Sequence, residues 1–172
     1  MKKHVQAAVI GGVVGCSVLY HLTKLGWKDV CLIERSELTS GSTWHAAGGF
    51  HTINGDPNVA KLQDYTIRLY KEIEEISGQS IGLHMTGGVM LAGTLERVDF
   101  LKMARAKGRY LGMDGMEMIS VDEAAELFPL MDKSKFVGAM YSPDEGHLDP
   151  SGTTHAYAEA AQMQGAEIYL KN

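Results

Sequence analysis

The sequence has few cysteines, no long apolar run and no excess of positive charge, and each shortage excludes a class of protein. Two cysteines among 172 residues exclude a scaffold built on disulfides. Cys16 and Cys31 have neither C-x-x-C nor metal-ligand spacing, so we expect both to be small buried side chains. The formal net charge of -5 argues against a protein that holds nucleic acid through its phosphates.

No apolar stretch reaches the length that spans a membrane, and the hydrophobic fraction of 45% is ordinary for a soluble globular protein. The segment Met1–Gln6 leaves no room for a signal peptide or an arginine-rich presequence before the first strand-like residues. These absences predict a cytoplasmic bacterial protein without membrane contact, although a mature mitochondrial-matrix form would look the same. The histidines and carboxylates show no H-E-x-x-H or similar spacing, so no metal site is predicted.

The amino-terminal part of the chain predicts a strand–helix–strand unit. Val5–Ile10 is small and β-branched, which is typical of a strand buried on both faces, and Gly11-Gly12 form a turn. Val13–Leu25 carries apolar residues at helical spacing and stops at Gly26. Asp29–Glu34 reads as a second buried strand that completes a βαβ unit. The expected apolar seam of the helix is Val14, Val18, Leu22 and Leu25.

The remaining residues predict three further regions. Arg35–Gly55 is rich in glycine and serine, with a short helical centre at Trp44–Ala47, and a segment of this length is more often functional than idle. The final helix, from Asp149-Pro150 to Gly165, and the strand Glu167–Leu170 are expected to return to the first sheet. We therefore divide the chain into 1–55, an inserted region 56–148 made of a helical linker and an α+β subdomain, and 149–172. Within the inserted region we expect helices over Asn58–Ser77, over Thr94–Leu111 and from Ser120 to Pro129, and strands over Gly88–Gly93, Met116–Ile119 and Lys135–Ser142.

The glycine turn after the first strand points to a dinucleotide. In the fingerprint G-x-G-x-x-G, one glycine permits the tight turn, one lets the backbone approach the pyrophosphate, and one lets helix and strand pack closely. Gly12 and Gly15 match the second and third positions, whereas Ile10 occupies the first and Gly11 stands one place late. Glu34 follows Gly15 by 19 residues and ends the second strand, where an acidic side chain can accept hydrogen bonds from ribose hydroxyls. The joint pattern favours dinucleotide binding over a turn that serves packing alone.

The residues after Glu34 favour a flavin over a nicotinamide, because a plain nicotinamide-binding domain would usually continue into another helix and strand. Small residues and hydroxyls fill Ser36–Gly49 instead, as suits a segment lying against an extended cofactor. From Glu34-Arg35 through Thr43-Trp44-His45-Ala46-Ala47-Gly48, the chain resembles the dimethylglycine and sarcosine dehydrogenases, within the D-amino-acid-oxidase-like flavoproteins. The resemblance covers nearly the whole chain, continuing through Leu69-Tyr70 to Gly78-Gln79, His84 to Leu91 and Gly146-His147-Leu148-Asp149-Pro150.

The resemblance implies an α/β fold: a Rossmann-like FAD-binding βαβ unit with an inserted α+β substrate subdomain, apparently truncated. It implies FAD as the cofactor, attached covalently through the 8α-methyl group to His45, and a neutral imidazole nitrogen can form such a bond. His51 is the competing attachment residue. The full set of predicted cofactor-binding residues is Gly11, Gly12, Gly15, Glu34, Arg35, Ser42, Thr43, Trp44, His45, Ala47 and Gly48.

The resemblance also implies an activity, the oxidation of the N-methyl group of a small amino acid such as dimethylglycine or sarcosine by hydride transfer to flavin. An electron-transfer flavoprotein would accept the electrons, or oxygen in an oxidase, and folate would enter only through a carboxy-terminal domain beyond this chain. No catalytic base can be named, and His84 and His147 are expected to be structural or surface residues. Two alternatives stay open: a non-catalytic truncated remnant of such an enzyme, and a nicotinamide-binding Rossmann domain.

Overall fold

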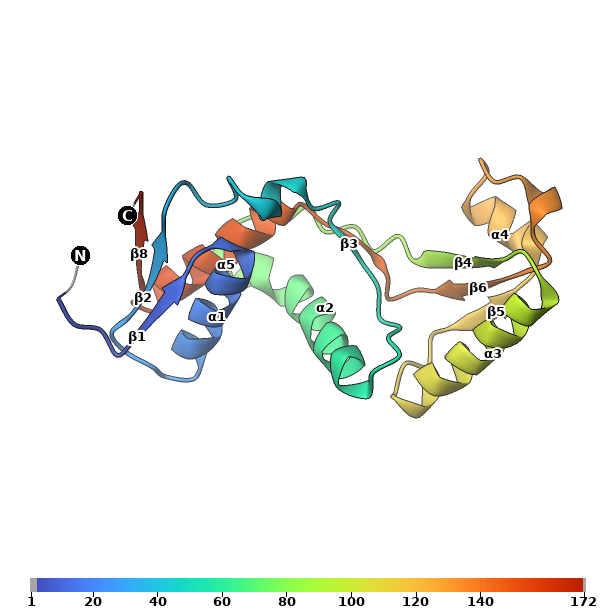
Figure 1. Cartoon of the computed structure of the whole chain (residues 1–172), viewed down its shortest axis with the longest axis horizontal. Helices are drawn as coiled ribbons and strands as arrows, with labels where there is room; N and C mark the ends of the chain where they lie inside the picture. The colour runs from blue at the N-terminus through green and yellow to red at the C-terminus, as the bar shows by residue number, and fades with distance from the viewer. Residues whose placement is uncertain (1–2, 172) are drawn as a thin grey trace. The chain divides into compact units, whose positions relative to one another are not determined.

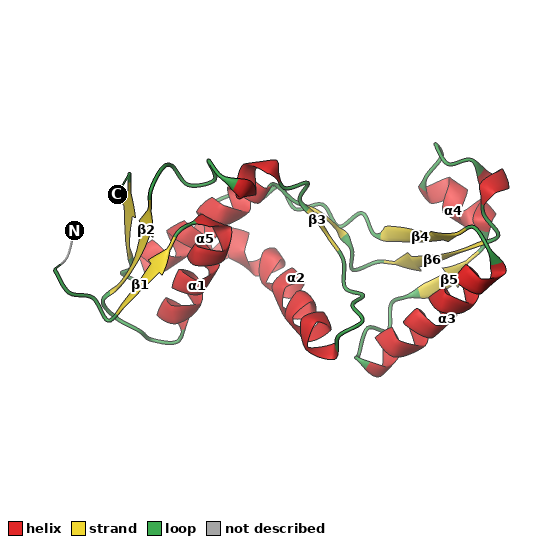
Figure 2. Cartoon of the chain, in the orientation of Figure 1, coloured by secondary structure: helices red, strands yellow, loops and turns green. Residues whose placement is uncertain are grey.

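A computed structural model describes residues 3–171 of the chain (Figures 1 and 2). The described residues of Met1–Gly48, Arg68–Leu83 and His147–Asn172 form one compact unit, and Gly49–Ile67 with His84–Gly146 form a second. The predicted boundaries 1–55, 56–148 and 149–172 stay predictions. In chain order the elements are β1 Ala7–Ile10, α1 Gly12–Lys24, β2 Val30–Glu34, η1 Ser42–His45, β3 Gly49–Phe50, α2 Pro57–Ser77, β4 Gly88–Ala92, α3 Leu95–Tyr110, β5 Glu117–Ile119, α4 Val121–Leu127, η2 Lys133–Lys135, β6 Gly138–Ser142, β7 Gly146–His147, α5 Pro150–Met163 and β8 Glu167–Leu170.

The first unit is built on a parallel three-stranded sheet in the order β1-β2-β8. Its register places Ile10 beside Ile33 and Glu34 beside Leu170. Helices α1 and α5 pack against each other (Figure 1). The rings of Tyr20 and Tyr157, one from each helix, lie 5.8 Å apart. The predicted βαβ unit is therefore confirmed, and so is the return of the last strand to the first sheet.

Two expectations about burial in this unit are wrong. Val5–Ile10 was expected to be buried on both faces, but β1 alternates between half-buried and exposed residues and Ile10 is 78% exposed, because β1 lies at the edge of the described sheet. The expected seam of α1 is largely exposed as well, with Val14 at 73% and Leu25 at 77%. Apolar residues occur all around α1, so spacing alone did not identify its packed face. The buried residues of α1 are Gly15, Cys16, Leu19, Tyr20 and Thr23.

Both cysteines are buried and free, as expected. Burial, with a smaller contribution from the negative charge of Glu34, raises the pKa of the Cys16 thiol to about 12. The thiol is therefore neutral at physiological pH and behaves as a small apolar side chain.

The second unit is built on an antiparallel sheet in the order β4-β6-β5, with Met140 of β6 paired to Met90 and to Met118. Its core combines Ala60, Ala92, Leu101, Met113, Met116 and Met140. Helix α2 begins in the second unit, where Leu62 is 63% exposed, and ends in the first, where Leu69 and Ile73 are buried. Neither unit contributes a described helix that is long and apolar enough to cross a membrane, within residues 3–171.

Side-chain caps fix the starts of two helices as the sequence predicts. The Ser120 hydroxyl accepts the backbone N–H of Glu123, whose carboxylate accepts the N–H of Ser120, a complete capping box for α4. The carboxylate of Asp149 caps α5 and Pro150 takes its first position. The caps explain why the predicted starts of these helices agree with the structure.

Candidate active site

A cavity of about 370 Å³ lies in the first unit, where β1 and β2 end and α1 begins. In parallel α/β sheets this edge, at the carboxyl ends of the strands, is where ligands bind. Six residues that line the cavity are not among the predicted cofactor-binding residues: Ile10 and Ile33 at the strand ends, and the loop residues Ser36, Thr39, Ser40 and Gly41. Six of the predicted residues line it: Gly11, Gly12, Glu34, Arg35, Ser42 and Thr43.

Each glycine of the turn has a distinct structural reason. A methyl group on Gly11 would lie 2.1 Å from a carboxylate oxygen of Glu34. Gly12 has a φ of +79°, which L side chains rarely adopt, and the space in front of it is open. A methyl group on Gly15 would lie 2.4 Å from the carbonyl oxygen of Ile10, so Gly15 sets the spacing between α1 and β1. Although Gly11 stands one place late in the fingerprint, the turn keeps the open space in front of Gly12 for a ligand and the close contact between helix and strand at Gly15.

Glu34 lies half-buried in the cavity wall, directly against Gly11 of the glycine turn. Its Oε1 accepts the backbone N–H of Ser36 at 3.0 Å. Helix α1 has no side-chain cap and no acidic residue in its first turn. A helix start with these properties favours an anion such as a pyrophosphate. The residues present therefore fit a dinucleotide, with Glu34 for the ribose hydroxyls and the α1 start for the phosphates.

The other predicted residues do not line this cavity. Gly15 is buried between α1 and β1, while Trp44, His45 and Ala47 are exposed in or just after η1. Gly48 has a φ of +76°, and a methyl group there would lie 2.1 Å from the carbonyl oxygen of Leu148. Gly48 is therefore required for a close backbone contact.

The orientation of His45 is fixed by one hydrogen bond. Its Nδ1 lies 3.1 Å from the carbonyl oxygen of Gly41, four residues earlier. A carbonyl oxygen only accepts, so Nδ1 carries the proton and donates it. In the neutral ring, Nε2 then holds the free lone pair, on an exposed side chain.

A buried polar cluster in the second unit has no counterpart among the predicted site residues. Burial raises the pKa of the Glu145 carboxyl, while the charge of His51 and hydrogen bonds from the Ser142 hydroxyl and the Thr52 N–H lower it. Glu145 is 8% exposed, and its Oε1 has no hydrogen-bond partner. The hydroxyl of the buried Thr52 also lacks one. A methyl group on Gly88 would lie 2.0 Å from the other carboxylate oxygen, so the bare backbone there accommodates the carboxyl group.

His84 and His147 are both exposed, in keeping with the structural or surface role expected of them. Over residues 3–171 no group of three or more histidine, cysteine or carboxylate side chains could hold a metal ion.

Comparison with known proteins identifies the family. A family model described as FAD dependent oxidoreductase matches residues 6–172. The chain is 40% identical over 165 residues to rat (Rattus norvegicus) mitochondrial dimethylglycine dehydrogenase, covering 95% of the chain and 19% of that protein. It is 36% identical over 159 residues to human (Homo sapiens) mitochondrial sarcosine dehydrogenase, covering 92% of the chain and 17% of that protein.

Among solved structures, the L-proline dehydrogenase from P. horikoshii superimposes with a TM-score of 0.91 at 28% identity, covering 99% of this chain and 45% of that one. The chain thus spans about a fifth of the length of the two dehydrogenases above and under half of this solved structure. With nearly the whole sequence matched by the family model, the chain belongs to the FAD-dependent oxidoreductase family.

Proposed function

We propose that this chain holds the FAD of an enzyme that oxidises the N-methyl group of a small amino acid, such as dimethylglycine or sarcosine. The observation that carries the proposal is the cavity between the glycine turn and Glu34, in a chain 40% identical to a dimethylglycine dehydrogenase. The chain covers 19% of that relative, so substrate and activity are proposals about the whole protein.

The residues of the first unit have separate tasks in this proposal. Glu34 accepts hydrogen bonds from the ribose hydroxyls, and the first turn of α1, opened by Gly12, receives the pyrophosphate. The hydroxyls of Ser42 and Thr43 bind polar atoms of the cofactor along the cavity wall. The bound flavin supplies the hydride acceptor, and the protein positions it and tunes its potential.

We further propose that His45 is the covalent attachment point of the flavin. The hydrogen bond from Nδ1 to the Gly41 carbonyl leaves Nε2 as the nucleophilic atom, and the exposed ring is free to react. His51 is the competing residue, but its charge acts on the buried carboxyl of Glu145 in the second unit. His45 instead lies two residues after the cavity-lining Thr43, in the first unit.

An absorbance spectrum before and after acid precipitation tests both statements. We expect flavin absorbance that stays with the precipitated protein, disappears from the pellet of His45→Ala, and persists in His51→Ala as the matched control. Flavin retained by the precipitate of His45→Ala would overturn the attachment point. A protein that binds NADH and not FAD would overturn the cofactor assignment and favour the nicotinamide-binding alternative.

The same proposal includes partners and location. Electrons pass to an electron-transfer flavoprotein or to oxygen, a folate enters only through a further domain, and the protein works in the cytoplasm of a bacterium. A chain that binds neither flavin nor NADH would instead favour the second candidate, a non-catalytic remnant, for which the glycine turn, one residue short, is the specific observation.

A further inference from the structure

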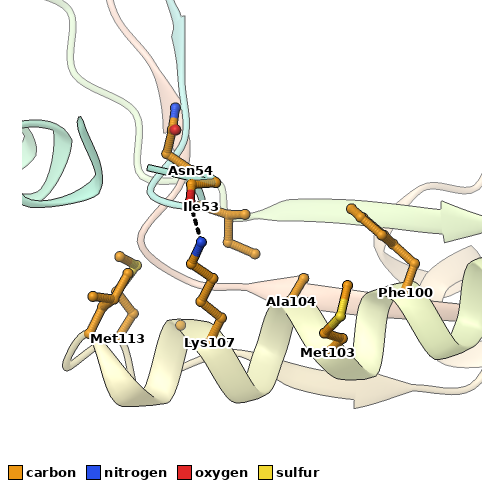
Figure 3. A pocket seen from close by; sticks show the side chains of 10 residues that line it. Ile53, Asn54, Phe100, Met103, Ala104, Lys107 and Met113 are labelled. Atoms are coloured by element: carbon orange, nitrogen blue, oxygen red, sulfur yellow. Dashed lines mark hydrogen bonds between the residues drawn. The ribbon is translucent and has the colours of Figure 1, made fainter. Parts of the chain in front are cut away.

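A second cavity, of about 280 Å³, lies wholly within the second unit, between α3 and the loop Ile53–Gly55 (Figure 3). Its size is close to the lower end of the range for small-molecule sites, about 300–1,000 Å³. None of its lining residues belongs to the FAD site described above. The cavity therefore needs an explanation of its own.

The walls of this cavity are apolar and its floor is part of the core. Phe100, Met103 and Ala104 stand at helical spacing on one face of α3, beneath Ile53 of the loop (Figure 3). At the far end Met113, 8% exposed, belongs to the core cluster of the second unit. A well-packed floor keeps the cavity open, and methionine side chains adapt to the shape of an apolar ligand.

Lys107 places a positive charge in the wall of the cavity. The Lys107 ammonium donates to the carbonyl oxygen of Gly55, and an ammonium group has three N–H donors, so donors remain for a second acceptor (Figure 3). The Arg97 guanidinium, which is not part of the lining, lies 4.2 Å from the centre of the ring of the lining residue Phe100. Helix α3 carries five lysines and arginines against two acidic residues, although the whole chain has a net charge of -5.

The Asp56 carboxylate, which feels the charge of Lys107, is already engaged by backbone N–H groups. Lys107 lowers the pKa of the Asp56 carboxyl, although hydrogen bonds from the N–H groups of Val59 and Asn58 lower it more. Those hydrogen bonds hold the carboxylate at the start of α2, at 2.8 Å from the Asn58 nitrogen and 3.0 Å from the Val59 nitrogen. The ammonium of Lys107 therefore retains capacity for a ligand anion on the side of the cavity.

We propose that this cavity binds a small carboxylate with an apolar body, such as a medium-chain aliphatic acid. The apolar chain lies along Phe100, Met103 and Met113, and the carboxylate accepts a hydrogen bond from Lys107. The site is separate from the FAD site and its occupation requires no flavin, so its failure and that of the proposed function are distinguishable.

Titration with octanoate tests the proposal directly, followed by NMR of protein labelled with ¹³C in the methionine methyl groups. We expect saturable shifts of the Met103 and Met113 methyl signals with octanoate. With octan-1-ol we expect binding at least fivefold weaker, and with octylamine no saturable shift. Equal affinities for all three would overturn the carboxylate assignment, and the absence of shifts with octanoate would overturn the site.

Two pairs of variants locate the binding. Ala104→Phe fills the cavity and should weaken octanoate at least tenfold, whereas Ala106→Phe, on the same helix outside the lining, should leave the affinity unchanged. Lys107→Gln should weaken octanoate about fivefold and leave octan-1-ol unaffected, while Lys102→Gln, whose ammonium pairs with Asp99, is the control. Equal effects within either pair would overturn the proposed place of binding.

Discussion

Replacing Gly15 by alanine tests the spacing between α1 and β1 that shapes the candidate FAD site. The added methyl group would lie 2.4 Å from the Ile10 carbonyl oxygen, whereas 3.4 Å or more is ordinary contact, so helix and strand must separate by about 1 Å. Overpacking of this kind costs about 1–3 kcal/mol, and the higher helix propensity of alanine returns up to about 1 kcal/mol. Because the obstacle is backbone, we expect the upper end of the cost and a net loss of about 2 kcal/mol.

Urea unfolding followed by far-UV circular dichroism measures this loss. A loss of about 2 kcal/mol corresponds to a midpoint lowered by about 1 M, given typical slopes for a chain of this size. Gly41→Ala is the matched control, since Gly41 also lies in the glycine-rich part of the site but has a φ of -98° and open space around it. An unchanged midpoint for Gly15→Ala, or equal losses for both variants, would refute the argument that Gly15 sets the helix–strand distance.

Three further predictions follow from hydrogen bonds and pKa shifts. Burial raises the pKa of the Glu145 carboxyl in the folded chain above its value in the unfolded chain. The protonated carboxyl therefore contributes its full stability below the unfolded-state pKa, and this contribution is lost as the pH rises through the folded-state pKa. Glu145→Gln should flatten this decline in urea midpoints measured against pH. Asp149→Ala removes the acceptor of the Ser151 and Gly152 N–H groups and should cost about 1 kcal/mol in the same assay. With a thiol pKa of about 12, Cys16 should resist iodoacetamide at pH 8 in the folded chain and react only in urea, as mass spectrometry would show.

The order and type of the elements could be predicted because their signals are local. The boundaries of α4 and α5 follow from side chains that cap their own helix, Ser120 with Glu123 and Asp149 with Pro150. Positive-φ glycines such as Gly26 follow helix ends. Local rules of this kind need no knowledge of what the helix packs against.

The packed faces were less predictable because they depend on distant residues. Helix α1 has valines and leucines on both sides, and the side that packs is decided by Tyr157 and its neighbours on α5, more than a hundred residues later. The same reason hid the Glu145 cluster: Ser142 is a neighbour of Glu145 in sequence, but Thr52 reaches that carboxyl from a segment far earlier in the chain. The cavity residues Ser36, Thr39 and Ser40 had a signal in the hydroxyl-rich composition of their loop, but no spacing rule selected them.

The short glycine turn shows how a motif can depart from its pattern and keep its geometry. The fingerprint places glycines where the turn is tight, where the backbone approaches the pyrophosphate, and where the helix packs against the strand. In this chain Gly11 lies against Glu34, Gly12 adopts the positive φ, and Gly15 lies against Ile10. The side chain of Ile10, at the nominal first position, is 78% exposed and lines the cavity, so it bounds the site without entering the turn. Ile10→Gly should therefore change the affinity for FAD far less than Gly12→Val, as quenching of FAD fluorescence would show. The opposite order would mean that position 10 does act as the first glycine position of the fingerprint.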